Sequence, residues 1–129
     1  KLYIRHLAPD DTTSVGGVYR DGWIISGINT IACYDVAVDT IPPVIVPVDE
    51  DNWKNKNAIK FSFEENETSL ASFMGTLDGR FVLFEYSSKN SEFTLDLNRE
   101  GVKRGIHDLR LVVVDKCGNE AVYEKEFEY

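Results

Sequence analysis

Apolar and polar side chains alternate in short runs along most of the chain, which is the period of two that half-buried β-strands show. The clearest run is Ala58 to Phe63, in which Ile59, Phe61 and Phe63 share one face of the strand. Turn residues separate such runs at the short, regular spacing typical of an all-β sandwich. No stretch combines helical spacing of apolar residues with recognisable caps, so we expect few helices.

After residue 41 the pattern predicts seven strands in two stacked sheets. They are Val44 to Val48, Ala58 to Phe63, Leu70 to Leu77, Arg80 to Tyr86, Phe93 to Leu97, His107 to Asp115 and Ala121 to Tyr129. Pro47 lacks a backbone N–H, which confines the first strand to a sheet edge. Asp78 and Gly79 predict a two-residue hairpin, because both central positions of such a turn need positive φ. We therefore expect residues 41–129 to form an immunoglobulin-like, seven-stranded β-sandwich domain.

Residues 1–40 carry three further strand-like runs and are too few to fold readily alone. The runs are Leu2 to Leu7, Val18 to Ser26 and Thr30 to Val38. We expect a partial β domain, or a small β segment that leans on the sandwich. The sequence TIPP at residues 40–43 makes a stiff extended linker, since each proline fixes its own φ and keeps the preceding residue out of the helical region. The domain boundary is placed there.

Composition and charge narrow the possible partners. The chain has 129 residues, 43% of them hydrophobic, and a formal net charge of -8. This charge repels phosphate backbones, so nucleic acid is not an expected partner. No apolar run approaches the roughly 18 residues that a membrane-spanning helix needs, so membrane insertion is not expected either. We expect a monomer.

The sequence contains no motif for catalysis. His6 and His107 are the only histidines, and neither has the spaced partners of a zinc site such as His-Glu-x-x-His. No Gly-x-Ser-x-Gly elbow occurs, and a nucleophilic triad cannot be assembled. His107 has the strand parity of Leu109 and Leu111, which favours a packed or half-exposed strand histidine. The chain is therefore predicted not to be an enzyme and to need no cofactor.

The two cysteines lie far apart in the sequence. Cys33 falls in a predicted strand and Cys117 in a predicted turn. A disulfide would need their Cα atoms within about 7 Å, and two free thiols are the preferred interpretation.

Oxygen-bearing side chains gather where the linker enters the sandwich. The loop after the second sandwich strand and the turn before the last strand lie at this pole, and calcium requires six to eight oxygen ligands from such segments. The candidate calcium ligands are Asp39, Glu64, Glu67, Asp115 and Asn119. The alternative is that Asp115 and Asn119 hydrogen-bond turn amides, as such side chains commonly do, while the glutamates stay solvated.

Trp53 is the one large apolar side chain in the polar segment DNWKNKN at residues 51–57. An indole ring in such a loop can stack on a saccharide, which makes Trp53 a candidate ligand-binding residue. The alternative is that it folds down and caps the sandwich.

A resemblance adds to this interpretation. The last two strands of many bacterial surface immunoglobulin-like domains resemble GIHDLRLVVVDKCGN at residues 105–119. Three further segments are GGVYRDGW at 16–23, YDVAVDTIPPVI at 34–45 and LDGRFVLFEY at 77–86. Together they resemble the non-catalytic carboxy-terminal β-sandwich region that follows a lysostaphin-type zinc peptidase domain in Bacteroidetes cell-envelope proteins.

The resemblance implies an extracytoplasmic protein, in the periplasm or at the cell surface, whose zinc peptidase domain cleaves peptidoglycan cross-links. The His and Asp motifs that hold that zinc are missing from these 129 residues. The leading hypothesis is therefore a non-enzymatic accessory region that spaces, orients or anchors a catalytic unit. Two alternatives are a carbohydrate- or peptidoglycan-binding module that uses Trp53, and an adhesin-type protein-interaction repeat. The corresponding partners are cell-wall glycan or an envelope protein.

Overall fold

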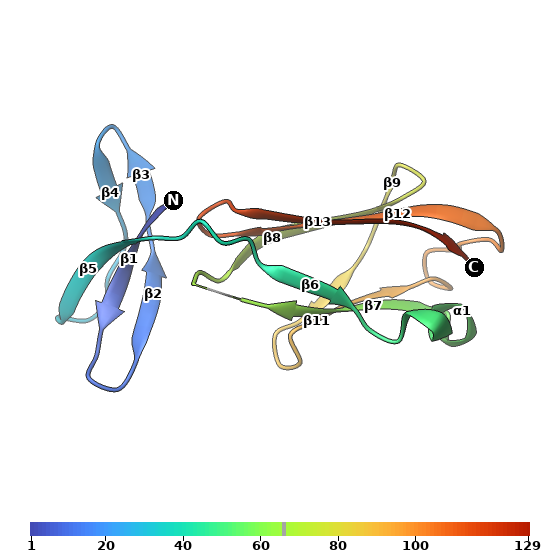
Figure 1. The fold of residues 1–129 in the computed structure, drawn as a ribbon, viewed down its shortest axis with the longest axis horizontal. Helices are drawn as coiled ribbons and strands as arrows, with labels where there is room; N and C mark the ends of the chain where they lie inside the picture. The colour runs from blue at the N-terminus through green and yellow to red at the C-terminus, as the bar shows by residue number, and fades with distance from the viewer. Residues whose placement is uncertain (66) are drawn as a thin grey trace.

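The computed structural model describes residues 1–65 and 67–129, and antiparallel β-sheet dominates it (Figure 1). The all-β prediction is confirmed. The strands fall into two groups along the long axis of the molecule. Residues 1–38 make the group at one end, and residues 44–129 make the longer group beside it.

The first group consists of a three-stranded sheet in the order β2-β1-β5 and a separate hairpin of β3 and β4. The strands are β1 (Leu2–Leu7), β2 (Thr12–Gly16), β3 (Val18–Arg20), β4 (Trp23–Ile25) and β5 (Cys33–Val38). The single strand predicted from Val18 to Ser26 is wrong, because Asp21 and Gly22 both have positive φ, 51° and 87°, and reverse the chain.

The second group consists of two four-stranded sheets in the orders β10-β11-β7-β6 and β13-β12-β8-β9. The strands of the first sheet are β6 (Val44–Pro47), β7 (Ala58–Glu64), β10 (Glu85–Ser87) and β11 (Glu92–Asp96). The strands of the second are β8 (Leu70–Leu77), β9 (Arg80–Val82), β12 (Ile106–Asp115) and β13 (Glu120–Glu128). Pro47 ends an edge strand, as predicted.

The described part of this sandwich has eight strands, whereas the sequence predicted seven. The run Arg80 to Tyr86 is split, since the chain leaves one sheet after β9 and joins the other at β10. Phe84 lies in this crossing and packs directly on Gly75 of β8, where an added Cβ would come within 2.3 Å of its ring. The predicted hairpin at Asp78 and Gly79 is confirmed, with φ values of 52° and 75°.

The core lies between the two sheets of the sandwich. In β7 the residues Ile59, Phe61 and Phe63 are buried, whereas the intervening Lys60 and Ser62 are partly exposed. The facing sheet contributes buried residues of the same parity from β12, and aromatic rings meet across the interior. Strict alternation therefore places one apolar face of each sheet against the other.

Helix is scarce, as predicted. One 3-10 turn, η1 (Glu50–Asn52), leads into one helical turn, α1 (Trp53–Lys56), between β6 and β7. Asn57 ends α1 with φ of 54°, a left-handed conformation that suits asparagine.

The extended segment 39–43 connects β5 to β6 and marks the place where the two groups of strands meet (Figure 1). The domain boundary between residues 40 and 41 stays a prediction, and so does the immunoglobulin-like class of the sandwich.

Candidate functional site

The described part of the chain buries four polar or charged residues, and all four lie where the two groups of strands meet. They are Asp39, Thr68, Asp115 and Asn119, with exposed fractions between 1% and 7%. We call this set the polar joint. Polar groups are buried at little cost only when they are hydrogen-bonded, and no described side chain is buried with an unsatisfied polar atom.

Asp39 follows β5 and begins the linker, and it makes hydrogen bonds to both sandwich loops of the polar joint. Its carboxylate accepts hydrogen bonds from the Thr68 hydroxyl at 2.7 Å and from the backbone N–H of Ile41 at 3.0 Å. Its backbone carbonyl accepts a third from the Asn119 side-chain amide at 3.2 Å. One residue of the linker is thus bonded to both sandwich loops at this pole.

Asp115 and Asn119 close the turn between β12 and β13. The Asp115 carboxylate accepts hydrogen bonds from the backbone N–H and the side-chain amide of Asn119, both at 2.8 Å. Gly118 has φ of 72° and donates its N–H to the Asp115 carbonyl at 2.9 Å. The turn therefore holds the Asn119 amide in place, so that it can also reach Asp39.

Strand β1 supplies a second set of contacts to the same pole. Tyr3 is 2% exposed, and its hydroxyl donates to the Glu67 carboxylate at 2.8 Å. Burial, together with this hydrogen bond, raises the pKa of Tyr3 to about 12. The Lys1 ammonium group donates to the Gly118 carbonyl, and the backbones of Lys1 and Asp39 extend the ladder between β1 and β5.

The structure brings together three of the five candidate calcium ligands, namely Asp39, Asp115 and Asn119. Asp115 and Asn119 hydrogen-bond each other within their turn, as the alternative interpretation describes. The Asp39 carboxylate accepts from the Thr68 hydroxyl and the Ile41 backbone N–H. Glu67 pairs with Tyr3 instead, and Glu64 is exposed at the end of β7. Within residues 1–65 and 67–129 no group of three or more His, Cys, Asp or Glu side chains could hold a metal ion. The calcium hypothesis gains no support.

Trp53 does not present the exposed ring that a saccharide platform requires. Trp53 is 3% exposed, because α1 turns its ring inward onto Phe61 and Phe127, with centroid distances of 5.5 and 6.3 Å. Its indole N–H donates to the Val48 carbonyl at 2.9 Å. Trp53 therefore caps the sandwich core, which was the alternative interpretation.

The exposure of the other tryptophan, Trp23, was not predicted. Trp23 is 73% exposed at the tip of the β3-β4 hairpin, directly after the Asp21-Gly22 turn. The same Asp-Gly dipeptide that revealed the hairpin at Asp78 would have revealed this one.

His107 is a half-buried strand residue, as predicted. Its two ring nitrogens face the Asp78 carboxylate at 2.6 Å and the Lys103 carbonyl at 2.7 Å. Both partners are acceptors, so the doubly protonated imidazolium satisfies both contacts. The hydrogen bond raises the pKa of His107 and lowers that of Asp78. This pair fastens the β8-β9 hairpin to β12, on the side of the sandwich away from the polar joint (Figure 1).

Neither cysteine forms a disulfide. Cys33 is exposed and Cys117 partly buried. Burial raises the pKa of the Cys117 thiol.

Comparisons with protein-family models, with curated proteins and with solved structures find no match for the chain. No described helix is long and apolar enough to span a membrane.

Proposed function

We infer that the chain is a non-enzymatic accessory region that holds its two groups of strands in one fixed relative orientation. The observation that carries this proposal is the polar joint. Buried polar residues cost free energy unless they are paired, and here they are paired with one another across the junction. A flexible spacer would need only the linker, whereas this junction adds hydrogen bonds from three separate segments.

The contacts at the junction start from two segments, the linker and β1. Asp39 bonds to Thr68 and Asn119 from the linker, and Tyr3 bonds to Glu67 from β1. Two attachment points, one in the linker and one on β1, restrict rotation about the linker as well as bending. Pro42 and Pro43 stiffen the linker itself.

The strand order supports an immunoglobulin-like class for the sandwich. With β6 as strand A, the first sheet reads D-E-B-A and the second reads G-F-C with one further edge strand. The resemblance described above points to the extracytoplasmic part of a cell-envelope protein, with a peptidase unit as the partner to be oriented.

Residual dipolar couplings of the isotopically labelled chain test the proposal. If the junction is rigid, the two groups of strands share one alignment tensor. Asp39→Ala combined with Asn119→Ala should give residues 1–38 a separate and smaller tensor. Asp51→Asn is the matched control, because this carboxylate is exposed on η1, away from the junction.

Separate tensors in the unsubstituted chain would refute the orienting role. If the double variant loses the sandwich fold, the single Tyr3→Phe variant removes the Glu67 contact from the other attachment point and serves the same purpose. Hydrolysis of peptidoglycan fragments by the purified chain would refute the non-enzymatic part separately.

A further inference from the structure

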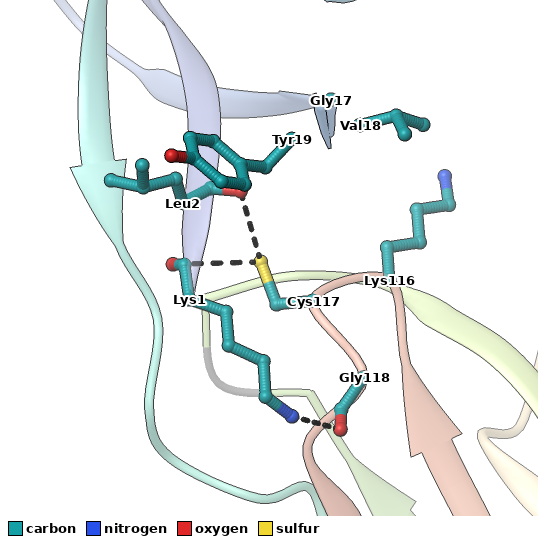
Figure 2. Close-up of a pocket in the computed structure, with 8 residues that line it drawn as sticks. All are labelled: Lys1, Leu2, Gly17, Val18, Tyr19, Lys116, Cys117 and Gly118. Carbon is teal, nitrogen blue, oxygen red and sulfur yellow. Dashed lines mark hydrogen bonds between the residues drawn. The ribbon is translucent and has the colours of Figure 1, made fainter. Parts of the chain in front are cut away.

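A surface pocket of about 550 Å³ lies beside the polar joint, between the first group of strands and the turn after β12 (Figure 2). Its walls include Leu2 of β1 and Val18 and Tyr19 of β3. Lys116 and Cys117 of the turn face them, and Lys1, Gly17 and Gly118 complete the lining. The volume is within the range of about 300–1,000 Å³ that small-molecule sites occupy.

The charged side chains in this pocket are all cationic. They are Lys1 and Lys116, in a chain whose formal net charge is -8. Two further surface pockets, of about 410 and 290 Å³, are lined by several carboxylates as well as cations. The buried carboxylates of Asp39 and Asp115 are not part of the lining. The pocket therefore favours an anionic group over a cationic one.

Lys116 is the cation that is available to a ligand. The Lys1 ammonium group already donates to the Gly118 carbonyl, whereas the Lys116 ammonium group has no hydrogen bond or ion pair with any residue that the structure describes. Lys116 is exposed, so pairing it with an anion does not require the fold to change.

The wall of the pocket opposite Lys116 is apolar and exposed to solvent. Val18 is 67% exposed, Tyr19 60% and Leu2 36%. Covering such side chains removes apolar surface from water, which is favourable in proportion to the area covered. A ligand with an anionic head and an apolar body thus satisfies both sides of the pocket.

We propose that this pocket binds a carboxylate amphiphile, with the carboxylate at Lys116 and a single alkyl chain along Leu2, Val18 and Tyr19. An alkyl chain fits better than a peptide, because each peptide unit brings an N–H and a C=O that need partners. The lining side chains offer only a hydroxyl, a thiol and two amines. The bound ligand would contact both groups of strands at once.

Protection of Cys117 from alkylation measures occupancy. In a Cys33→Ser background the remaining thiol lines the pocket, and its reaction with N-ethylmaleimide can be followed at a pH of about 8.5. We expect decanoate to slow the reaction at least tenfold in a saturable manner. Decyltrimethylammonium, which has the same chain length and a cationic head, and propanoate, which lacks the long chain, should not protect.

Lys116→Gln should weaken decanoate binding about tenfold, since a charge-assisted contact is lost. Lys89→Gln is the matched control, because Lys89 is exposed in the turn between β10 and β11. In the reciprocal Cys117→Ser protein, decanoate should not change the rate of Cys33 alkylation, since Cys33 begins β5 opposite Leu7, away from the junction.

Absence of protection by decanoate would overturn the proposal, as would equal protection by the cationic amphiphile or unchanged affinity in Lys116→Gln. Amide chemical shifts give a second measurement. Changes confined to residues 1–2, 17–19 and 116–118 support the site, whereas changes that also appear around the exposed Trp23 and Phe81 would show general adsorption to apolar surface and overturn it.

Discussion

Residues 1–38 and residues 44–129 are both built from antiparallel strands, yet they differ in what covers their apolar side chains. Fifteen of the sixteen buried hydrophobic residues among those described belong to the sandwich, and the sixteenth is Tyr3. Ten of the eighteen exposed large hydrophobic residues lie in the first 38 positions. A sandwich has two layers that cover each other, whereas the first group has one sheet and a hairpin.

The comparison shows that alternation specifies a strand but not a core. Hydrogen bonds at the junction hold the first group of strands against the sandwich. Packing of buried apolar side chains stabilises the sandwich itself. Each of the following experiments tests one side of this difference.

The largest expected effect concerns the two tryptophans. Trp53→Ala should destabilise the protein by about 3–5 kcal/mol, because it removes a buried ring from the core. Trp23→Ala should change the free energy of unfolding by no more than about 0.5 kcal/mol, because its ring is mostly in water. Urea denaturation followed by far-UV circular dichroism measures both. Equal effects would contradict the comparison.

Asp39→Ala should lower the free energy of unfolding by about 1–3 kcal/mol, since it leaves the buried Thr68 hydroxyl and the Ile41 backbone N–H without their acceptor. We expect the loss to be local, so that amide hydrogen exchange speeds up in β1 and β5 while β7 and β12 keep their protection. The control is Asp35→Ala, which breaks the partly exposed pair with Arg5 and should leave exchange at the junction unchanged. Uniform loss of protection would mean that the two groups unfold as one unit.

The pair of His107 and Asp78 should make the sandwich pH-dependent. The raised pKa of His107 means that its contribution is complete below the ordinary histidine pKa of about 6.5 and is lost as the pH rises through the folded pKa. The lowered pKa of Asp78 means that its contribution is present above about 4 and is lost as the pH falls through the folded value. The pair therefore stabilises most between these limits, by less than about 1 kcal/mol.

Urea denaturation of the unsubstituted chain and of His107→Gln, at several pH values from 5 to 9, measures this contribution. The difference between the two proteins should shrink on the alkaline side. A constant difference across that range would show that the imidazolium form is not the one that matters.

The smallest expected effect is that of calcium on the thermal midpoint of unfolding. The carboxylate oxygens of Asp39 and Asp115 already accept hydrogen bonds, so millimolar calcium should leave the thermal midpoint where a chelator leaves it. A midpoint that rises with calcium concentration would show that an ion can open the polar joint and replace its hydrogen bonds.

Much of the sandwich could be predicted because local rules decide it. The alternation around Phe61 predicts a strand, and the Asp78-Gly79 turn predicts a hairpin, and both are present. Arg80 to Tyr86 alternates as well, but its crossing between sheets depends on the space above Gly75, which is a tertiary contact that the local pattern does not contain. Trp53 shows the same limit, since polar neighbours do not reveal that a single helical turn points its ring inward.

For the site, the sequence identified the place but not the chemistry. Asp39, Asp115 and Asn119 do converge at the pole where the linker enters, as strand connectivity required. Whether such oxygens bind an ion or accept hydrogen bonds depends on the donors that reach them. The Thr68 hydroxyl, which donates to Asp39, was not predicted from the sequence.

The attachment of Asp39 has a mechanical consequence. A pull on the first strands reaches the sandwich covalently along residues 39–43 and also through hydrogen bonds, one of which joins Asp39 to the turn that precedes the last strand. Load is thus shared between the first and the last strands of the sandwich, on different sheets, so tension spreads over both layers before any single strand can peel away.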